Sequence, residues 1–323
     1  MPRAIRFDRT GGPEVLYLAE VGSEAPGPGQ VQIRQRAIGV NFIDVYHRNG
    51  LYAVPGLPSG LGNEAAGVVT AVGPGVSEFK PGDRVGYGGS APGAYAEQRV
   101  MPADRLVPLP EGISDELAAA ILLKGMTVEA LVERTVPVRS GDTVLVHAAA
   151  GGVGLLLCQW LSNRGVRVIG TVSTEQKAEL ALAHGADEIV IGHDDFVARV
   201  RELTGGRGVR IAYDSIGRTT VPGSIECLAV RGALIAYGNA SGKPEPIDVL
   251  TLAKGSLFVT RPVLFHYIAE RSELLASARA VFDGVLSGVL RVHIGQRFAL
   301  ADAAKAHGAL ESRRTSGATV LLP

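Results

Sequence analysis

The first third of the chain alternates apolar and polar residues with the period of a β-strand. Between residues 30 and 37, Val31, Ile33 and Ala37 fall on one side, whereas Arg34 falls on the other. A period of two predicts a half-buried strand. Further strands are predicted at 64–72, 84–87 and 93–100, separated by turns rich in glycine and proline. The pattern predicts a β-rich domain with few helices in this part of the chain.

From residue 143 onward, short apolar runs alternate with longer amphipathic segments. The apolar runs predict strands at 143–147, 166–171, 209–214, 233–237 and 257–260. The amphipathic segments predict helices at 152–163, 174–184 and 194–204. Repeated βαβ units of this kind indicate a doubly wound parallel sheet, so the fold class is α/β.

The last 60 or so residues depart from the βαβ pattern. They predict helices at 271–286 and 301–310 and a final strand at 318–322. We expect this tail to return and complete the first domain. The predicted boundaries are therefore 1–123 completed by 263–323 for the β-rich domain, and 124–262 for the parallel-sheet domain.

Composition and charge exclude several classes of protein. The 323 residues include 32 Lys plus Arg and 32 Asp plus Glu, so the net charge is zero and no nucleic-acid partner is expected. The longest apolar run, 144–158, has 15 residues, fewer than the roughly 18 that span a membrane, so no membrane association is expected. Two cysteines, Cys158 and Cys227, do not make a disulfide framework, which favours the cytoplasm.

A glycine-rich turn separates the strand predicted at 143–147 from the helix predicted at 152–163. Ala149, Gly151 and Gly154 have the spacing of the G-x-G-x-x-G dinucleotide motif, with alanine at the first position. Small residues there make the tight turn, admit a pyrophosphate and let the helix pack on the strand. The helix N-terminus then offers amide groups to the phosphates. This turn predicts a dinucleotide site.

The tip of the next strand distinguishes NADPH from NADH. An NAD site places an acidic residue at that tip, whereas this chain has Ser173 there and Lys177 in the first turn of the following helix. Ser173 also fits an N-cap with Gln176 as its capping-box partner. A cation in a first turn opposes the helix dipole unless it binds a phosphate. The pattern favours NADPH, although Glu175 offers an alternative contact to a ribose.

Several segments together resemble the zeta-crystallin-like quinone oxidoreductases, a branch of the medium-chain dehydrogenase/reductases. The resemblance runs from the N-terminus to the final strand and implies a GroES-like domain, a Rossmann domain and an active-site cleft between them. It also implies NADPH as hydride donor and a homodimer or homotetramer. The segments that carry it are 41–46, 60–67, 82–85, 123–127, 147–154 and 238–242.

The resemblance assigns cofactor contacts to positions along the whole chain. It places Asn41, Tyr46 and Thr127 at the nicotinamide end, Gly151, Gly152 and Val153 at the pyrophosphate, and Ser173 and Lys177 at the 2′-phosphate. Later loops contribute Asn239, Ser241, Phe265 and Arg313. Relatives often carry a tyrosine near the 2′-phosphate, where this chain has His193 as a substitute.

Two further cofactor contacts are predicted from position in the fold. Ser215 follows the strand predicted at 209–214 on the carboxyl side of the sheet, where ligands bind. Lys124 stands before Gly125, where a helix is expected to end, so a helix-capping role and an active-site role are both open.

The residues that bind zinc in related alcohol dehydrogenases are replaced in this chain. Asn41 and Asn63 stand where those enzymes have Cys and His, and Glu64 alone cannot hold Zn²⁺. We therefore expect no metal and interpret Glu64 as a structural hydrogen-bond partner. The histidines show no ligand spacing and are interpreted as surface or loop residues.

The predicted lack of a metal ion narrows the range of substrates that the protein could reduce. Reduction of a simple ketone makes a strongly basic alkoxide, whereas hydride addition to a quinone makes a weakly basic anion that needs only positioning and hydrogen bonds. We expect a quinone acceptor, with Asn41, Tyr46 and Tyr52 as the catalytic residues. From the residue pattern alone, an ordinary turn residue and two half-buried loop aromatics fit these positions equally well.

Other functions remain open at this stage. An alkenal or enone places a similar electronic demand on the enzyme, so reduction of an activated double bond is an alternative. A non-enzymatic role, as a crystallin-like structural protein or an RNA-binding protein, is a third. We also expect a homodimer joined through the apolar edge strand at 257–260, because such edges need a partner or a cover.

Overall fold

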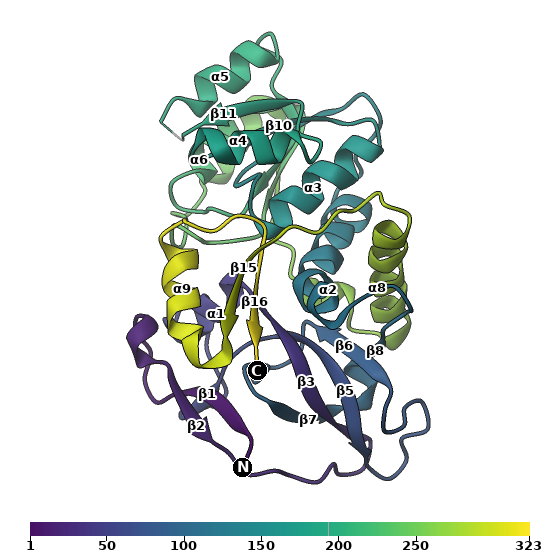
Figure 1. Ribbon diagram of the computed structural model, residues 1–323. Coiled ribbons are helices and arrows are strands. Elements are labelled where there is room, and N and C mark those ends of the chain that lie inside the picture. The colour runs from purple at the N-terminus through teal and green to yellow at the C-terminus, as the bar shows by residue number, and fades with distance from the viewer. Residues whose placement is uncertain (193) are drawn as a thin grey trace. The chain divides into compact units, whose positions relative to one another are not determined.

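The computed structural model describes residues 1–192 and 194–323 (Figure 1). The chain divides into two compact units. Unit 1 comprises Met1–Met126, Phe265–Leu286 and Val292–Pro323, and unit 2 comprises Thr127–Leu264 and Ser287–Arg291. The predicted domain boundaries lie near these divisions, but the sequence assigned the segment Ser287–Arg291 to the β-rich domain and the structure groups it with unit 2.

The larger sheet of unit 1 combines strands from both ends of the chain. Its described strands follow the order β15, β16, β3, β5, β6, β8, with β7 also paired to β3. Strand β16 pairs antiparallel with β3, so Val320 lies opposite Gly39, and Figure 1 shows the yellow β16 beside the purple β3. The bounds are β3 Gln30–Val40, β5 Glu64–Val72, β6 Arg84–Gly88, β7 Gln98–Pro102, β8 Val107–Pro108, β15 Ile294–Ala299 and β16 Ala318–Leu322.

The period-two pattern of β3 decides which of its faces enters the core. Val31 and Ile33 are fully buried, and Arg34 on the opposite face is exposed. A smaller sheet of unit 1 follows the order β2 (Tyr17–Glu20), β1 (Arg3–Phe7), β4 (Ser59–Gly60). The predicted β-rich domain is thus present, although the strand expected at 93–100 begins only at Gln98.

Helices α1, α8, α9 and most of α2 belong to unit 1. Sequence analysis predicted that the helix before Gly125 ends at Lys124, but α2 continues to Glu129. A Cβ on Gly125 would lie 2.6 Å from Val281 Cγ1 of α8, so glycine inside the helix permits close packing. The bounds are α1 Phe42–Arg48, α2 Asp115–Glu129, α7 Leu264–Tyr267, α8 Arg271–Leu286 and α9 Ala303–Glu311.

The described residues of unit 2 form a parallel sheet in the order β11, β10, β9, β12, β13, β14. The strand order therefore reverses between β9 and β12, which is the topological switch point of a Rossmann fold. The predicted doubly wound sheet is confirmed. The bounds are β9 Thr143–Val146, β10 Arg167–Val172, β11 Glu188–Ile191, β12 Val209–Asp214, β13 Leu228–Ala236 and β14 Phe258–Thr260.

Apolar runs place each central strand of unit 2 in the core. Leu145, Ile169, Ala212 and Leu234 are fully buried in one cluster. The helices between the strands are α3 Gly152–Asn163, α4 Glu175–Leu182, α5 Phe196–Leu203 and α6 Val221–Glu226. Short 3₁₀ and π turns complete the chain at Pro13–Val15, Ala103–Arg105, Ala130–Thr135, Val249–Gly255 and Leu300–Asp302.

Both cysteines are free and buried. Burial raises the pKa of the Cys158 thiol to about 12 and that of the Cys227 thiol to about 12, so neither is a reactive thiolate at neutral pH. Among the described residues, none of the helices combines the length and apolar character that a membrane crossing requires.

Candidate functional site

The turn between β9 and α3 is built from small residues because its backbone folds closely on itself. A Cβ on Gly154 would lie 2.2 Å from the carbonyl oxygen of Ala148, so only glycine fits there. Ala148 itself has φ +51°, a left-handed conformation that is unusual for alanine. Gly151 is the N-cap of α3, and within the described chain no side chain caps this helix.

This geometry suits a dinucleotide phosphate. The first amides of α3, from Gly152 and Val153, lie at the positive end of the helix dipole. Uncapped amides at such a helix start are donors for a pyrophosphate, and the glycines leave the backbone accessible. The turn thus fits the cofactor expected from the sequence.

The segment after β10 differs in detail from the sequence-based expectation. The predicted N-cap Ser173 is wrong: the cap of α4 is Thr174, whose hydroxyl accepts from Lys177 N at 3.3 Å. The strand continues through Val172, which moves the cap one residue along. Ser173 is left exposed at the strand tip, and Lys177 is half-buried in the first turn of α4. Their contact with a 2′-phosphate stays a prediction.

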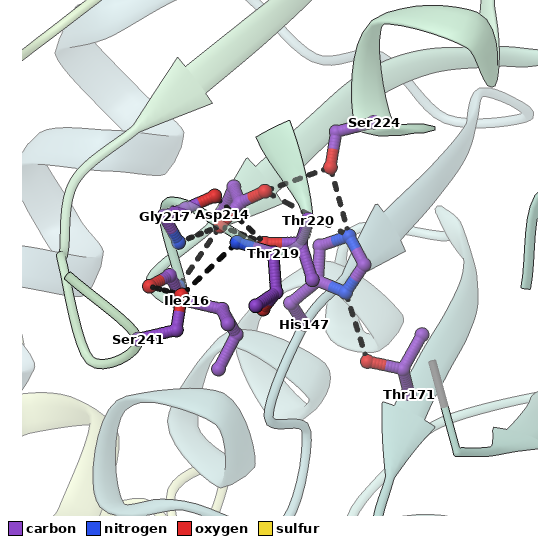
Figure 2. Close-up of polar contacts among 9 residues, drawn as sticks. All are labelled: His147, Thr171, Asp214, Ile216, Gly217, Thr219, Thr220, Ser224 and Ser241. Atoms are coloured by element: carbon purple, nitrogen blue, oxygen red, sulfur yellow. Dashed lines mark hydrogen bonds and ion pairs between the residues drawn. The ribbon is translucent and has the colours of Figure 1, made fainter. Parts of the chain in front are cut away.

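The loops after β12 and β13 are joined through Ser241. Its backbone N and its hydroxyl both donate to the Ile216 carbonyl oxygen, at 2.7 and 2.8 Å, and its Oγ accepts from Thr219 N at 3.1 Å (Figure 2). Ser215 and Asn239 are half-buried in the same pair of loops. These predicted contacts therefore share one local structure at the carboxyl ends of the strands.

Asn41, a predicted catalytic residue of unit 1, is the N-cap of α1 and is almost fully buried. Its backbone N donates to Asp44 Oδ2 at 2.9 Å, and its side-chain Nδ2 donates to Glu64 Oε2 at 2.8 Å. Glu64 thus orients the side-chain amide of Asn41, and Asp44 fixes its backbone N–H.

Glu64 acts as the structural acceptor that the sequence predicted. It is fully buried, and Lys124 Nζ lies 2.9 Å from its Oε2. Leu123 N donates to the other oxygen at 2.7 Å. The ammonium of Lys124 therefore compensates a buried carboxylate. Whether Lys124 also contacts a cofactor stays a prediction.

The donor set around Glu64 does not fit Zn²⁺. Both oxygens of Glu64 are engaged, the Lys124 ammonium would repel a cation, and the Asn63 side-chain amide donates to the Ser90 carbonyl. Zinc requires thiolate, imidazole or further carboxylate ligands. Within the part of the chain that the structure describes, no group of three or more His, Cys, Asp or Glu could hold a metal ion.

A buried chain of hydrogen bonds extends from Asp44 to α9. Asp44, Tyr95, His307 and Arg48, here called the α1 network, are nearly inaccessible to solvent. Tyr95 OH donates to Asp44 Oδ2 at 3.0 Å and lies 3.1 Å from His307 Nε2. Arg48 donates to His307 Nδ1 at 3.0 Å, so the proton of the ring is on Nε2.

Burial shifts both titratable groups of this network. Desolvation raises the pKa of Asp44 to about 7. Desolvation, together with the charge of Arg48, lowers the pKa of His307 to about 3. The interpretation of the histidines as surface or loop residues is wrong for His47 and His307, which are buried in α1 and α9, whereas His147 lies in the turn after β9, although it too is buried. The sequence contained no local signal for these contacts, since the partners lie far apart in the chain.

The two predicted catalytic tyrosines are neighbours. Tyr52 N donates to the Tyr46 carbonyl at 2.9 Å, and their rings meet edge to face with centroids 5.2 Å apart. Tyr46 is not a loop residue, as the alternative interpretation had it, but is buried in α1. Tyr52 is half-buried in the segment that follows.

The remaining predicted cofactor contacts occupy separate elements. Thr127 is half-buried in α2, Phe265 is half-buried in α7, and Arg313 is exposed with φ +58° after α9. His193 lies outside the described residues. The cofactor contacts of all four stay predictions.

Comparison with known proteins agrees with both units. The alcohol dehydrogenase GroES-like domain matches residues 27–111, and the zinc-binding dehydrogenase family matches residues 152–278. A quinone oxidoreductase from Pseudomonas aeruginosa is 50% identical over 325 residues, covering 100% of both chains. This chain belongs to the quinone oxidoreductase family. The resemblance to that branch of the medium-chain dehydrogenase/reductases is confirmed.

Two further similar proteins bear on function. The crystal structure of Escherichia coli quinone oxidoreductase complexed with NADPH has a TM-score of 0.97 and 46% identity, over 99% of this chain and 100% of that chain. A 2-haloacrylate reductase from a Burkholderia species is 45% identical over 331 residues, covering 100% of this chain and 99% of the relative.

Proposed function

We propose that this member of the quinone oxidoreductase family is an enzyme that uses NADPH to reduce quinones. The observation that carries the proposal is the full-length match, with a TM-score of 0.97, to a quinone oxidoreductase that binds NADPH. The uncapped glycine turn at the start of α3 supports it independently. One NADPH and one proton would convert one quinone to one hydroquinone.

The cofactor contacts proposed for unit 2 lie at the carboxyl ends of its strands. Gly151, Gly152 and Val153 would bind the pyrophosphate, and Ser173 and Lys177 the 2′-phosphate. Ser215, Asn239 and Ser241 would line the loops beyond them. When bound, NADPH supplies a hydride from the nicotinamide.

The acceptor contacts proposed for unit 1 are Asn41, Tyr46 and Tyr52. Glu64 accepts from the side-chain Nδ2 of Asn41 and Asp44 from its backbone N, so the side-chain amide is oriented before a ligand arrives. The buried ring of Tyr46 packs edge to face against the half-buried ring of Tyr52, so the ring and hydroxyl of Tyr52 are held in an orientation that suits contact with a quinone. Since a quinone is already electrophilic, positioning and hydrogen bonds suffice on the protein side.

Reduction of an activated double bond is a second candidate. The 45% identity to a 2-haloacrylate reductase over the full length favours it. An acrylate carries a double bond conjugated to a carboxyl carbon and accepts hydride at carbon. The same oriented amide and hydride donor would serve either acceptor.

The test is a kinetic comparison of acceptors. Purified protein is assayed for NADPH oxidation with a naphthoquinone and with an enone of similar size, with and without a chelator. We expect a higher kcat/KM with the naphthoquinone and no effect of the chelator. A large preference for the enone would replace the first candidate by the second, and loss of turnover with chelator would overturn the metal-free reaction.

We further propose that the protein forms a homodimer through the edge strand β14 and that it is located in the cytoplasm. Phe258 is 60% exposed on this strand, and Val230, Val249 and Leu250 nearby are 74–80% exposed. An apolar edge of this kind favours pairing with a second copy. Light scattering should show a dimer that Phe258→Glu converts to monomer. A wild-type monomer at every concentration would contradict the proposed homodimer.

The free buried cysteines support the cytoplasmic location.

A further inference from the structure

A fully buried polar network joins the carboxyl ends of β9, β10 and β12 in unit 2 (Figure 2). Its members are His147, which follows β9, Thr171 in β10, Asp214 at the end of β12 and Ser224 in α6. We call these four residues the strand-end network. None of the predicted cofactor contacts is a member of it.

The carboxylate of Asp214 accepts hydrogen bonds at both oxygens. Oδ1 accepts from Ile216 N at 2.9 Å, Gly217 N at 3.0 Å and Thr220 Oγ1 at 2.9 Å. Oδ2 accepts from Ser224 Oγ at 2.7 Å. The charge is therefore stabilised by amide and hydroxyl dipoles at the start of the loop that contains Ser215.

This carboxylate also sets the direction of the remaining hydrogen bonds. Because the one hydroxyl proton of Ser224 goes to Asp214, Ser224 Oγ accepts from His147 Nε2 at 2.9 Å. The other ring nitrogen, Nδ1, lies 2.9 Å from Thr171 Oγ1. The ring of His147 is thus held from both sides and connects Thr171 to Ser224, as Figure 2 shows.

Each end of the network adjoins a segment that we propose binds the cofactor. His147 directly precedes Ala148, whose left-handed backbone opens the glycine turn. Thr171 lies two residues before Ser173, and its carbonyl accepts from Ala149 N at 3.0 Å. Asp214 directly precedes Ser215 and binds the amide of Ile216, whose carbonyl accepts from Ser241.

The network also lies at the topological switch point, since His147 follows β9 and Asp214 ends β12. Ligands bind to doubly wound sheets at this point. The strained φ of Ala148 persists only if its surroundings fix it. The strand-end network supplies such a constraint directly beneath the turn.

We propose that His147 and Asp214 are positioning residues for NADPH, which fix the loops after β9, β10 and β12 in the arrangement that binds it. This inference rests on the proposed function. Loops that are already ordered lose less conformational entropy when a ligand binds, so the network raises affinity without touching the cofactor. The members of the network are fully buried, and Ser224 lies between His147 and Asp214. In a hydrolytic triad the order differs, because the histidine lies between the serine and the carboxylate.

The test removes the connection between the strands without emptying the core. His147→Leu keeps much of the side-chain volume but removes the ring that contacts Thr171 and Ser224. Ser224→Ala is a smaller change that interrupts the same network. We expect either variant to raise the Kd of NADPH about tenfold while kcat at saturating NADPH changes less than about threefold. His147→Gln, which keeps a donor and an acceptor, should restore part of the affinity.

Thr204→Val is the matched control. The Thr204 hydroxyl is also buried in unit 2, where it donates to the Val200 carbonyl at 2.8 Å and accepts from Gly208 N at 3.1 Å, next to the amino end of β12. Its loss should lower the melting temperature without changing the Kd of NADPH. This contrast separates positioning from a general loss of stability.

The outcomes distinguish this inference from the proposed function. If wild-type protein binds no NADPH, both are overturned. If wild type binds NADPH and folded His147→Leu and Ser224→Ala bind it equally well, only the inference is overturned. An equal loss of affinity in Thr204→Val would also overturn it, because the effect would then follow stability rather than the strand ends.

Discussion

Units 1 and 2 each bury a carboxylate completely, but they stabilise it with different partners. Glu64 in unit 1 is paired with the ammonium of Lys124. Asp214 in unit 2 accepts hydrogen bonds from two backbone amides and two hydroxyl groups, which together stabilise its carboxylate. Stabilisation of a buried charge by one opposite charge is lost when that single residue is replaced. When several dipoles stabilise the charge, the loss of any one of them removes only part of the stabilisation.

The largest expected effect breaks the ion pair of unit 1. Lys124→Met leaves Glu64 buried beside an apolar side chain, which should cost about 3–5 kcal/mol of unfolding free energy. Denaturant unfolding measures the change. Adding Glu64→Gln should recover much of the loss, because the double variant no longer buries an uncompensated charge.

Lys80→Met is the matched control for this prediction. Lys80 pairs with Asp83 on the surface, with its side chain 81% exposed. Exposed pairs contribute less than about 1 kcal/mol. If Lys124→Met destabilised the protein no more than Lys80→Met, the pairing of Glu64 with Lys124 would not matter for stability.

A second prediction uses the opposite pKa shifts of the α1 network. The pKa of Asp44 is raised by burial to about 7, so its contribution to stability is full below about 4 and is lost as pH rises to about 7. The pKa of His307 is lowered to about 3, so its contribution is full above about 6.5 and is lost as pH falls toward 3. The two slopes oppose each other between about pH 4 and 6.5.

Single variants should therefore reveal each slope. His307→Gln removes the contribution of His307, so its stability relative to wild type should fall as pH rises from about 3 to 6.5. Asp44→Asn removes the contribution of Asp44, so its stability relative to wild type should rise as pH rises from about 4 to 7. Urea unfolding at several pH values measures both, and parallel pH profiles of the two variants would contradict the assignment.

The smallest expected effect on stability concerns an accessible cation of unit 2. Lys177 is half-buried in the first turn of α4, so Lys177→Ala should change unfolding free energy by less than about 0.5 kcal/mol. It should raise the Kd of NADPH about tenfold and leave that of NADH nearly unchanged. Fluorescence titration with both nucleotides tests the difference, and equal losses would refute a role at the 2′-phosphate.

Local sequence patterns predicted much of this fold. The helix 152–163 and the helix 271–286 have the predicted bounds, as do the strands 64–72, 209–214 and 318–322. In these segments periodicity, turn residues and burial all agree. The glycine turn was recognisable for the same reason, since its requirements lie within a few adjacent residues.

Contacts between distant residues could not be predicted in this way. Asp44 meets Tyr95, and Tyr95 meets His307, which is 212 residues further along the chain. His147 and Asp214 were part of predicted strands, but their connection through Ser224 depends on α6, which no periodic pattern marked. Likewise, the cap at Thr174 rather than Ser173 depends on where pairing in the sheet ends.

The position of β16 affects the order in which the protein can fold during synthesis. This strand lies between β15 and β3, so the large sheet of unit 1 closes only after residues 318–322 have left the ribosome. Residues 127–264, most of unit 2, emerge earlier and as one continuous stretch. Because domains generally fold as units, the nascent Rossmann domain can fold before β16 is available to pair with β3.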